Sequence, residues 1–317
     1  MEISRCLYCY QALGDQEIDF HPPCSKKFFG TELPPELGFT SDEMEELARQ
    51  IISQRIAVTG VQPKLSLEIE KVPKDPKRTR LTIVGLWGNY ILKPPTQAFK
   101  SLPENEDLTM HLAAAFDLPA AEHSLIRLKS GELAYITKRF DRTRKEKLAM
   151  EDACQFTETL TANKYRSSME KVGRSIQNFS TQPGLEAIRF FELALFCFIT
   201  GNADMHLKNF SLLTTATNDV ILAPGYDLLC TKIALPEDQD EMALTINGKK
   251  SRITRTDFDA LAKNLGIPDK ALNNIYSRFA DGFYRTDEWI QSSFLPDPMK
   301  PDYKGILATR ARILRLT

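Results

Sequence analysis

The stretch Gly201–Leu213, GNADMHLKNFSLL, contains an acid, a histidine, a lysine and an amide within six residues. Directly before it, Ala187–Ile199, AIRFFELALFCFI, is apolar on nearly every side, which predicts a buried helix. The FSLL that ends the stretch is short and apolar and predicts a strand. A polar loop held between a buried helix and a strand is a rigid support for functional side chains. We therefore expect the loop to carry a functional site.

The spacing of three polar residues indicates the chemistry. Asp204 and Asn209 are five positions apart, and a second acid, Asp227, follows in APGYD. Kinases use an Asp to accept a substrate hydroxyl proton, and an Asn and a later Asp to hold Mg²⁺ against the phosphates of ATP. Any one of these residues alone is better explained as a cap or turn residue. The set favours phosphoryl transfer, with Asp204 as base and Asn209 and Asp227 as metal ligands.

Composition restricts the class of protein. The chain has 317 residues and a formal net charge of −1, so no global field directs it to nucleic acid or to a membrane. The apolar run at 190–200 is too short to cross a bilayer, and the N-terminus does not resemble a signal peptide. Six cysteines in a chain this long do not indicate a secreted disulfide scaffold. These features predict a cytoplasmic enzyme.

The N-terminal segment contains two pairs of possible zinc ligands. Cys6 and Cys9 form one pair, His21 and Cys24 the other, with eleven residues between the pairs. Four Cys and His ligands in two close pairs are typical of a small zinc knuckle. The alternative is a cluster of half-buried thiols beside a histidine in a proline-bounded turn.

Three further segments could contact a nucleotide. The loop Thr59–Lys64 between two predicted strands can cover phosphates with backbone N–H groups and a lysine, or be an ordinary hairpin. Lys93 ends an apolar strand and can either pair phosphates or face water. Its ion-pair partner would be Glu106, although Glu104 is nearly as good a candidate. The strand before Lys138–Phe140 leads into a loop whose backbone could contact adenine.

The order of predicted elements indicates an α+β fold. Strands dominate 56–137 and helices dominate 150–317, which predicts a two-lobed protein-kinase-like layout with lobes 1–145 and 146–317. Lys71–Arg80 is predicted to be a charged hairpin tip that forms a solvated loop. The polar segment 161–184 is predicted to be mobile enough to gate a site or meet a substrate. Thr256 and Asp259 are predicted to cap a helix.

With these residues identified, the chain resembles the HipA family of bacterial serine/threonine kinases, the toxins of type II toxin–antitoxin pairs. The matching runs cover the chain from about residue 30 to its end in family order. They are VTGVQPKLSL at 58–67, ILKPP at 91–95, PENE at 103–106, RFDR at 139–142, MEDACQ at 150–155, GNADMHLKNFSL at 201–212 and APGYDLL at 223–229.

The resemblance implies roles for individual residues. It makes Asp204 the catalytic base, Asn209 and Asp227 the Mg²⁺ ligands, and Lys93 the phosphate-pairing lysine. Through it the nucleotide-binding candidates become Thr59, Gly60, Val61, Gln62, Pro63, Lys64, Lys93, Lys138, Arg139, Phe140, His206, Lys208, Asn209, Tyr226 and Asp227. ATP and Mg²⁺ are the implied cofactors, and the N-terminal Cys/His pairs lie outside the family's catalytic pattern.

The resemblance also implies partners. The chain has no room for the N-terminal subdomain of full-length members, so it resembles the short form HipT, which acts beside a small HipS-like protein and a HipB-like antitoxin. The implied substrate is an aminoacyl-tRNA synthetase. Short members carry two serines before the loop glycine as autophosphorylation sites; here Ala57 and Thr59 occupy those positions, which leaves Thr59.

Two rival functions stay open. A kinase fold can act on a small molecule or a lipid, since fold does not fix substrate. An inactive kinase-like module could bind a partner, although the intact Asp204, Asn209, Asp227 and Lys93 argue against lost activity.

Overall fold

The computed structural model describes residues 4–44, 46–47, 64–73, 75–84, 87–143 and 146–317. The chain divides into two compact units. Unit 1 comprises Met1–Asp107, Ala121–Phe140 and Ser292–Leu295, and unit 2 comprises Leu108–Ala120, Asp141–Gln291 and Pro296–Thr317. Each unit is described by itself below.

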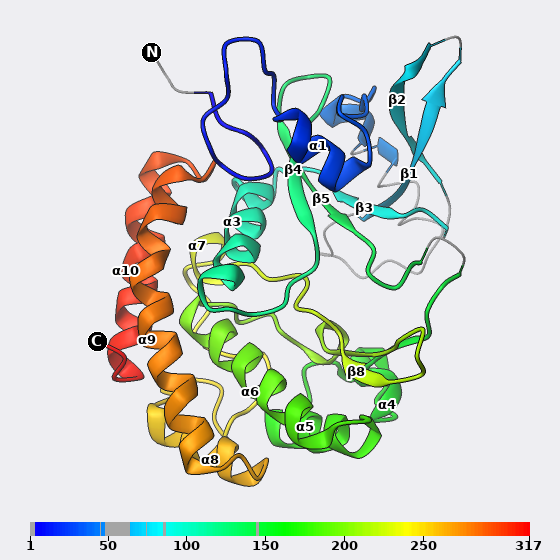
Figure 1. The fold of residues 1–317 in the computed structure, drawn as a ribbon. Helices are drawn as coiled ribbons and strands as arrows, with labels where there is room; N and C mark the ends of the chain where they lie inside the picture. The colour runs from blue at the N-terminus through cyan, green and yellow to red at the C-terminus, as the bar shows by residue number, and fades with distance from the viewer. Residues whose placement is uncertain (1–3, 45, 48–63, 74, 85–86, 144–145) are drawn as a thin grey trace. The chain divides into compact units, whose positions relative to one another are not determined.

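Unit 1 is built on a five-stranded antiparallel sheet in the order β2-β1-β3-β5-β4 (Figure 1). The strands are β1 Leu65–Val72, β2 Asp75–Ile83, β3 Tyr90–Lys93, β4 His123–Arg127 and β5 Leu133–Lys138. Leu67, Leu92, Leu125 and Ile136 are buried with the N-terminal Leu7 in one apolar cluster. This burial supplies most of the stabilisation of the sheet, because apolar area removed from water is the largest favourable term in folding.

Unit 1 also contains helical segments, which precede the first strand or lie between two strands along the chain. Helix α1 spans Pro22–Phe29 and α3 spans Leu102–Ala115, of which residues 102–107 belong to unit 1. Residues 41–44 are also helical, and a capping box formed by Thr40 and Glu43 begins this helical segment. The Thr40 backbone N–H donates to the Glu43 carboxylate at 2.8 Å, and the Glu43 N–H donates to the Thr40 hydroxyl at 3.3 Å.

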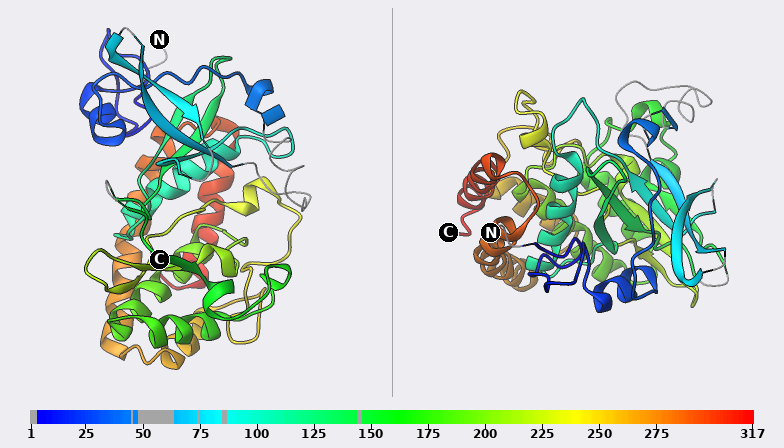
Figure 2. Two further views of the ribbon diagram at one scale, coloured as in Figure 1. Left: turned by 90° about the vertical axis from the view of Figure 1, so that its right-hand side faces the viewer. Right: turned by 90° about the horizontal axis from the view of Figure 1, so that it is seen from above.

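Unit 2 is mainly helical and is organised around α6, Pro183–Ile199. Ten consecutive residues, 190–199, are buried, as the all-round apolar sequence predicts. A three-stranded antiparallel sheet, β6 Met150–Asp152, β7 Ser211–Thr214 and β8 Val220–Leu222, lies in the same unit. Helix α6 contacts β8 and three helices, α5 (Met169–Phe179), α8 (Arg255–Asn264) and α10 (Lys300–Ile313) (Figure 2).

Two long helices, α9 (Asp269–Ser292) and α10 (Lys300–Ile313), end the chain. They are joined by an ion pair between Asp287 on α9 and Lys304 on α10. The remaining elements are α4 Ala153–Phe156, η1 Thr161–Asn163, η2 Leu207–Asn209, α7 Thr231–Ala234 and η3 Asp297–Met299.

Three local predictions need correction. The segment 71–80 belongs to the predicted hairpin, since β1 ends at Val72 and pairs antiparallel with β2, which begins at Asp75. Most of it is strand and not loop, because Thr79 and Leu81 alternate into the buried side of β2. The polar segment 161–184 contains the helix α5, whose N-terminus is capped by Ser168. The cap of α8 is Thr254 and not Thr256: Thr254 and Asp257 form a capping box.

Asp257 provides a test of stability in unit 2. Its carboxylate accepts hydrogen bonds from Lys249 Nζ at 2.8 Å, Asn247 Nδ2 at 2.8 Å and the Thr254 N–H at 2.9 Å. Burial alone would raise the pKa of Asp257, but these donors outweigh it and lower the pKa from 3.8 to about 2. Replacing Asp257 by alanine is expected to reduce the free energy of unfolding by about 2 kcal/mol at neutral pH.

The pH dependence has a defined sign. A depressed carboxyl pKa contributes stability above its unfolded-state value, and this contribution is lost as the pH falls from 3.8 towards about 2. Denaturant unfolding at several pH values should show the difference between the two proteins vanish in that window. The control is Asp281→Ala, which removes an exposed carboxylate of α9 and should cost less than ~0.5 kcal/mol. An equal loss in both variants would contradict the prediction.

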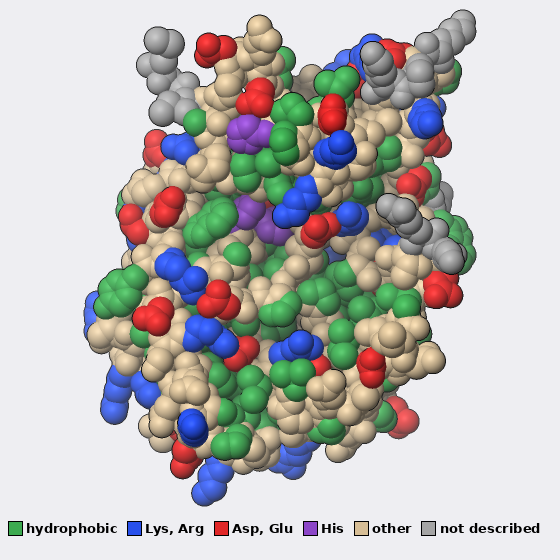
Figure 3. Space-filling model, viewed as in Figure 1, with side chains coloured by type: hydrophobic (Ala, Val, Ile, Leu, Met, Phe, Trp, Pro, Cys, Tyr) green, Lys and Arg blue, Asp and Glu red, His purple; other side chains and the backbone are tan. Residues whose placement is uncertain are grey.

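The surface mixes charges of both signs. On the face drawn in Figure 3, Lys and Arg side chains are interspersed with Asp and Glu. Among the helices in the described part of the chain, none combines the length and the apolar character needed to cross a bilayer.

Candidate active site

The loop 201–210 of unit 2 begins where α6 ends. Gly201 adopts a left-handed backbone with φ 69°, and a Cβ atom there would lie 2.9 Å from Ile306 Cγ2. Glycine meets both requirements at once. The Thr231 hydroxyl donates to the Gly201 carbonyl at 3.0 Å and accepts from the Ala203 N–H at 2.8 Å. The loop is therefore fixed at its start by a residue thirty positions away.

Asp204 lies half-buried in this loop, in contact with polar groups on several sides. Tyr165 Oη donates to Asp204 Oδ1 at 2.6 Å, and Asn209 Nδ2 donates to the Asp204 carbonyl at 3.1 Å. The Asp204 N–H donates to Asn202 Oδ1 at 3.1 Å. Burial, with the Asp204 carboxylate as a second cause, raises the pKa of Tyr165, so the phenol stays a donor at neutral pH. These bonds set the direction of the carboxylate.

His206 lies beside Asp204 and is 6% exposed. Its Nε2 accepts from Lys164 Nζ at 2.8 Å, and its ring packs edge-on against Tyr165 at 5.0 Å. Burial lowers the pKa of His206, opposed by the charges of Asp204 and Asp227 and assisted by Lys164. A lysine ammonium can only donate, so Nε2 carries the lone pair and the ring proton lies on Nδ1. This buried Nδ1 has no hydrogen-bond partner among the described groups. It is a donor available to a ligand.

Lys208 and Tyr226 hold the loop from its other side. Lys208 Nζ donates to Asp152 Oδ2 at 2.6 Å, and Asp152 also caps α4. The Tyr226 hydroxyl lies 2.6 Å from Ser211 Oγ and donates to the Lys208 carbonyl at 3.0 Å. Both predicted nucleotide-binding residues thus make contacts inside unit 2 that position the residues around them.

Asp227 has a backbone conformation that is uncommon for a residue with a side chain. Its φ is 55°, in the left-handed region. Residues held in this region cluster at functional sites. Asn209 commits its amide nitrogen to the Asp204 carbonyl, so its side-chain oxygen remains for a cation. An amide oxygen and a carboxylate are ligands that Mg²⁺ accepts, and the two residues therefore fit the predicted metal.

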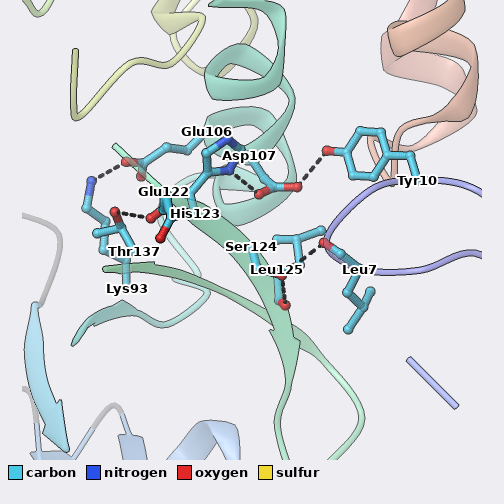
Figure 4. Close-up of polar contacts among 10 residues, drawn as sticks. All are labelled: Leu7, Tyr10, Lys93, Glu106, Asp107, Glu122, His123, Ser124, Leu125 and Thr137. Atoms are coloured by element: carbon cyan, nitrogen blue, oxygen red, sulfur yellow. Dashed lines mark hydrogen bonds and ion pairs between the residues drawn. The ribbon is translucent and has the colours of Figure 1, made fainter. Parts of the chain in front are cut away.

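In unit 1, Lys93 pairs with Glu106 of α3 (Figure 4). The side chains are 3% and 1% exposed, and the ammonium lies 5.3 Å from the centre of the Tyr135 ring. Residues two apart on a helix do not share a face, so Glu104 and Glu106 cannot both reach Lys93. The structure selects Glu106. Of the two alternatives for Lys93, the structure agrees with the inward-facing one, because a lysine that faced water would be exposed.

The segment Lys138–Phe140 ends β5 of unit 1. The Lys138 N–H donates to the Glu122 carbonyl at 2.8 Å, and the Arg139 N–H donates to the Asn89 carbonyl at 2.8 Å. These two backbone donors are therefore already used within the sheet. An adenine contact made by this segment would have to use other groups.

Part of the predicted phosphate loop, Thr59–Pro63, lies outside the described residues. The last residue of that loop, Lys64, is described and exposed, directly before β1.

The four N-terminal metal-ligand candidates come together. The Sγ atoms of Cys6, Cys9 and Cys24 and one ring nitrogen of His21 all lie within 4.8 Å of one another. Burial, with the nearby Cys6 as the next cause, raises the pKa of Cys24 to about 12.

Sequence reasoning missed Lys164 and Tyr165, which contact His206 and Asp204. They lie about forty positions upstream in a polar stretch, and no periodicity or motif marks them. Only the packing of η1 beside the loop brings them to the site.

Solved structures share this α+β fold, which is the two-lobed kinase-like fold predicted from the sequence. A Shewanella oneidensis HipA, solved with HipB and operator DNA, matches 89% of this chain and 73% of its own at a TM-score of 0.66 and 23% identity. The Helicobacter pylori proinflammatory kinase CtkA matches 72% of this chain and 88% of its own at a TM-score of 0.53 and 17% identity.

The family model of the HipA-like C-terminal domain matches residues 56–286, and the chain belongs to that family. Among sequence relatives, the Sinorhizobium fredii protein named "Putative kinase Y4mE" is 28% identical over 279 residues, covering 83% of this chain. A Haemophilus influenzae "Putative kinase" is 25% identical and covers 83% of both chains. The Shewanella oneidensis "Serine/threonine-protein kinase toxin HipA" is 27% identical over 71% of this chain. The chain spans 64% of the length of Y4mE and 55% of that HipA.

Proposed function

We propose that the chain is an ATP-dependent protein serine/threonine kinase. One observation carries the proposal: Asp204, His206 and Asn209 share one loop, in which the Asn209 amide donates to the Asp204 carbonyl at 3.1 Å. This is the spacing and clustering that phosphoryl transfer requires. The buried Lys93–Glu106 pair supplies the further lysine–glutamate element that kinases use.

Each residue has a defined task in this proposal. Asp204 accepts the substrate hydroxyl proton on the carboxylate that Tyr165 orients. Asn209 and Asp227 hold Mg²⁺, which neutralises phosphate charge when it is bound. His206 Nδ1–H donates to an oxygen of the bound ligand. Lys93, whose ammonium forms an ion pair with the Glu106 carboxylate, pairs with phosphates.

The proposal extends to partners. The protein hydroxyl that accepts the phosphoryl group belongs to an aminoacyl-tRNA synthetase, an assignment supported by the family resemblance alone. A HipB-like antitoxin is the proposed partner, supported by the Shewanella HipA structure, which contains HipB. A HipS-like small protein completes the proposed set.

The decisive experiment incubates the purified chain with labelled ATP, Mg²⁺ and a cell lysate. A labelled protein, absent with Asp204→Asn, supports a protein kinase. A labelled small molecule or lipid instead would favour the rival enzyme, and no labelled product would favour an inactive module.

Mass spectrometry of the same chain tests whether Thr59 acquires a phosphate. About −2 charge there would repel the triphosphate, so modification should lower ATP affinity.

Tyr165→Phe is expected to lower kcat about tenfold and leave KM for ATP within about twofold. The reason is that the lost hydrogen bond orients the reacting carboxylate and does not hold the nucleotide. Steady-state kinetics measures both constants. Tyr284→Phe, at a 70% exposed tyrosine of α9, is the control and should leave both unchanged. An unaltered kcat in Tyr165→Phe would show that the phenol plays no part in orienting Asp204.

A further inference from the structure

The N-terminal cluster has the interatomic distances of a metal site. Cys9 Sγ lies 3.5 Å and Cys24 Sγ 3.7 Å from His21 Nδ1. A tetrahedral zinc ion with Zn–S of ~2.3 Å and Zn–N of ~2.05 Å separates sulfur from nitrogen by about 3.6 Å. The two measured distances lie on either side of that value. A cation can therefore enter the cluster with little movement of its ligands.

The surroundings of His21 support the same assignment. Its Nε2 lies 3.0 Å from the Ala12 carbonyl, to which it can only donate. The proton is thereby placed on Nε2, and Nδ1 presents its lone pair to the three sulfurs. Metal-bound histidines are commonly fixed in this way by a carbonyl or carboxylate on the other ring nitrogen.

The sulfur ligands are free to bind a cation. Cys6, Cys9 and Cys24 are all free thiols, so no disulfide occupies the cluster. Cysteine sulfur and imidazole nitrogen are the ligands that a structural zinc ion takes.

One ligand pair lies on a tight turn and the other at a helix start. The Tyr10 N–H donates to the Cys6 carbonyl at 2.9 Å, and Tyr10 itself has φ 63°. His21 is the N-cap of α1, and Cys24 lies in its first turn. The intervening loop has little regular structure, and its Ile18 side chain is 79% exposed, whereas Leu7, Tyr10 and Phe20 are buried. A metal ion would add to this apolar burial by tying the Cys6–Cys9 turn to the start of α1.

We propose that Cys6, Cys9, His21 and Cys24 bind one structural Zn²⁺ ion that fixes the N-terminal loop on unit 1. The loop then reaches helix α3. Tyr10 Oη donates to Asp107 Oδ2 at 2.6 Å, and Asp107 Oδ1 also lies 2.7 Å from His123 Nδ1 (Figure 4). Asp107 directly follows Glu106, the partner of Lys93. The N-terminal loop thus holds Asp107 in place. The same turn of α3 carries Glu106, which positions Lys93.

The test begins with metal analysis of the unmodified chain, purified under reducing conditions. About one zinc per chain is expected. Cys24→Ser should reduce the zinc content at least tenfold, whereas Cys154→Ser, at a buried cysteine outside the cluster, should retain it. Replacing zinc by Co²⁺ in the unmodified chain should give sulfur-to-cobalt charge-transfer bands and the visible bands of a tetrahedral ion. The cobalt spectrum decides the proposal even where Cys24→Ser does not fold.

Absence of zinc together with absence of a tetrahedral cobalt spectrum would overturn the proposal, as would full zinc retention in a folded Cys24→Ser. The link to Lys93 rests on the proposed function and has its own readout. Zinc-depleted chain, with the chelator removed, should bind Mg·ATP several-fold more weakly, and added zinc should restore the affinity. Equal affinity would remove that link. Absence of ATP binding by the zinc-loaded chain would instead count against the kinase.

Discussion

Asp204→Asn is expected to lower phosphoryl transfer by ~10²–10⁴-fold, the usual range for loss of a general base. Asparagine has the same shape and can still accept from Tyr165 Oη, but it cannot take the hydroxyl proton. ATP affinity should stay within about threefold, because the proton-accepting carboxylate is not one of the proposed metal ligands. Single-turnover transfer to the labelled substrate and calorimetric titration with ATP measure the two quantities.

The control for Asp204 is Asp281→Asn, an exposed carboxylate on α9. It should leave both transfer and affinity unchanged. Transfer by Asp204→Asn within a few-fold of the parent would remove Asp204 from the role of base. It would leave its hydrogen bonds to Asn202 and Tyr165 as a purely structural arrangement.

Asp227→Asn is expected to weaken Mg·ATP binding at least tenfold, about 1.4 kcal/mol. The substitution suits the site because asparagine tolerates the left-handed φ of 55°, whereas alanine would add backbone strain. What is lost is the negative charge that neutralises the cation. Calorimetry with ATP in the presence and absence of Mg²⁺ separates the effects. The loss should appear only with Mg²⁺ present.

Asp117→Asn provides a matched comparison for Asp227, since Asp117 also has positive φ, 57°, lies in unit 2 and is exposed. It removes one negative charge at a left-handed position outside the loop 201–210 and should not alter nucleotide affinity. Equal affinity of Asp227→Asn and the parent for Mg·ATP would show that Asp227 only shapes its turn.

Local features of the sequence predicted several elements correctly. The all-apolar run 187–199 is the buried helix α6, and FSLL largely coincides with β7. The apolar strand ending in Lys93 is β3. Each of these depends on neighbouring residues, since the pattern of apolar residues along a short segment reports its burial. The errors at 71–80 and at Thr256 arose where strand pairing or a cap two residues away outweighed local polarity.

The sequence by itself predicted the class of chemistry, because the Asp204–Asn209 spacing is a local feature of the chain. The tertiary structure decided what each side chain contacts. It selected Glu106 over Glu104, brought Tyr165 and Lys164 to the loop, and used the Lys138 and Arg139 backbone N–H groups within the sheet. The physical reason is the sequence separation of the residues that interact. Burial and turns are set by adjacent residues, whereas a hydrogen bond between residues 39 positions apart exists only once the elements between them have packed.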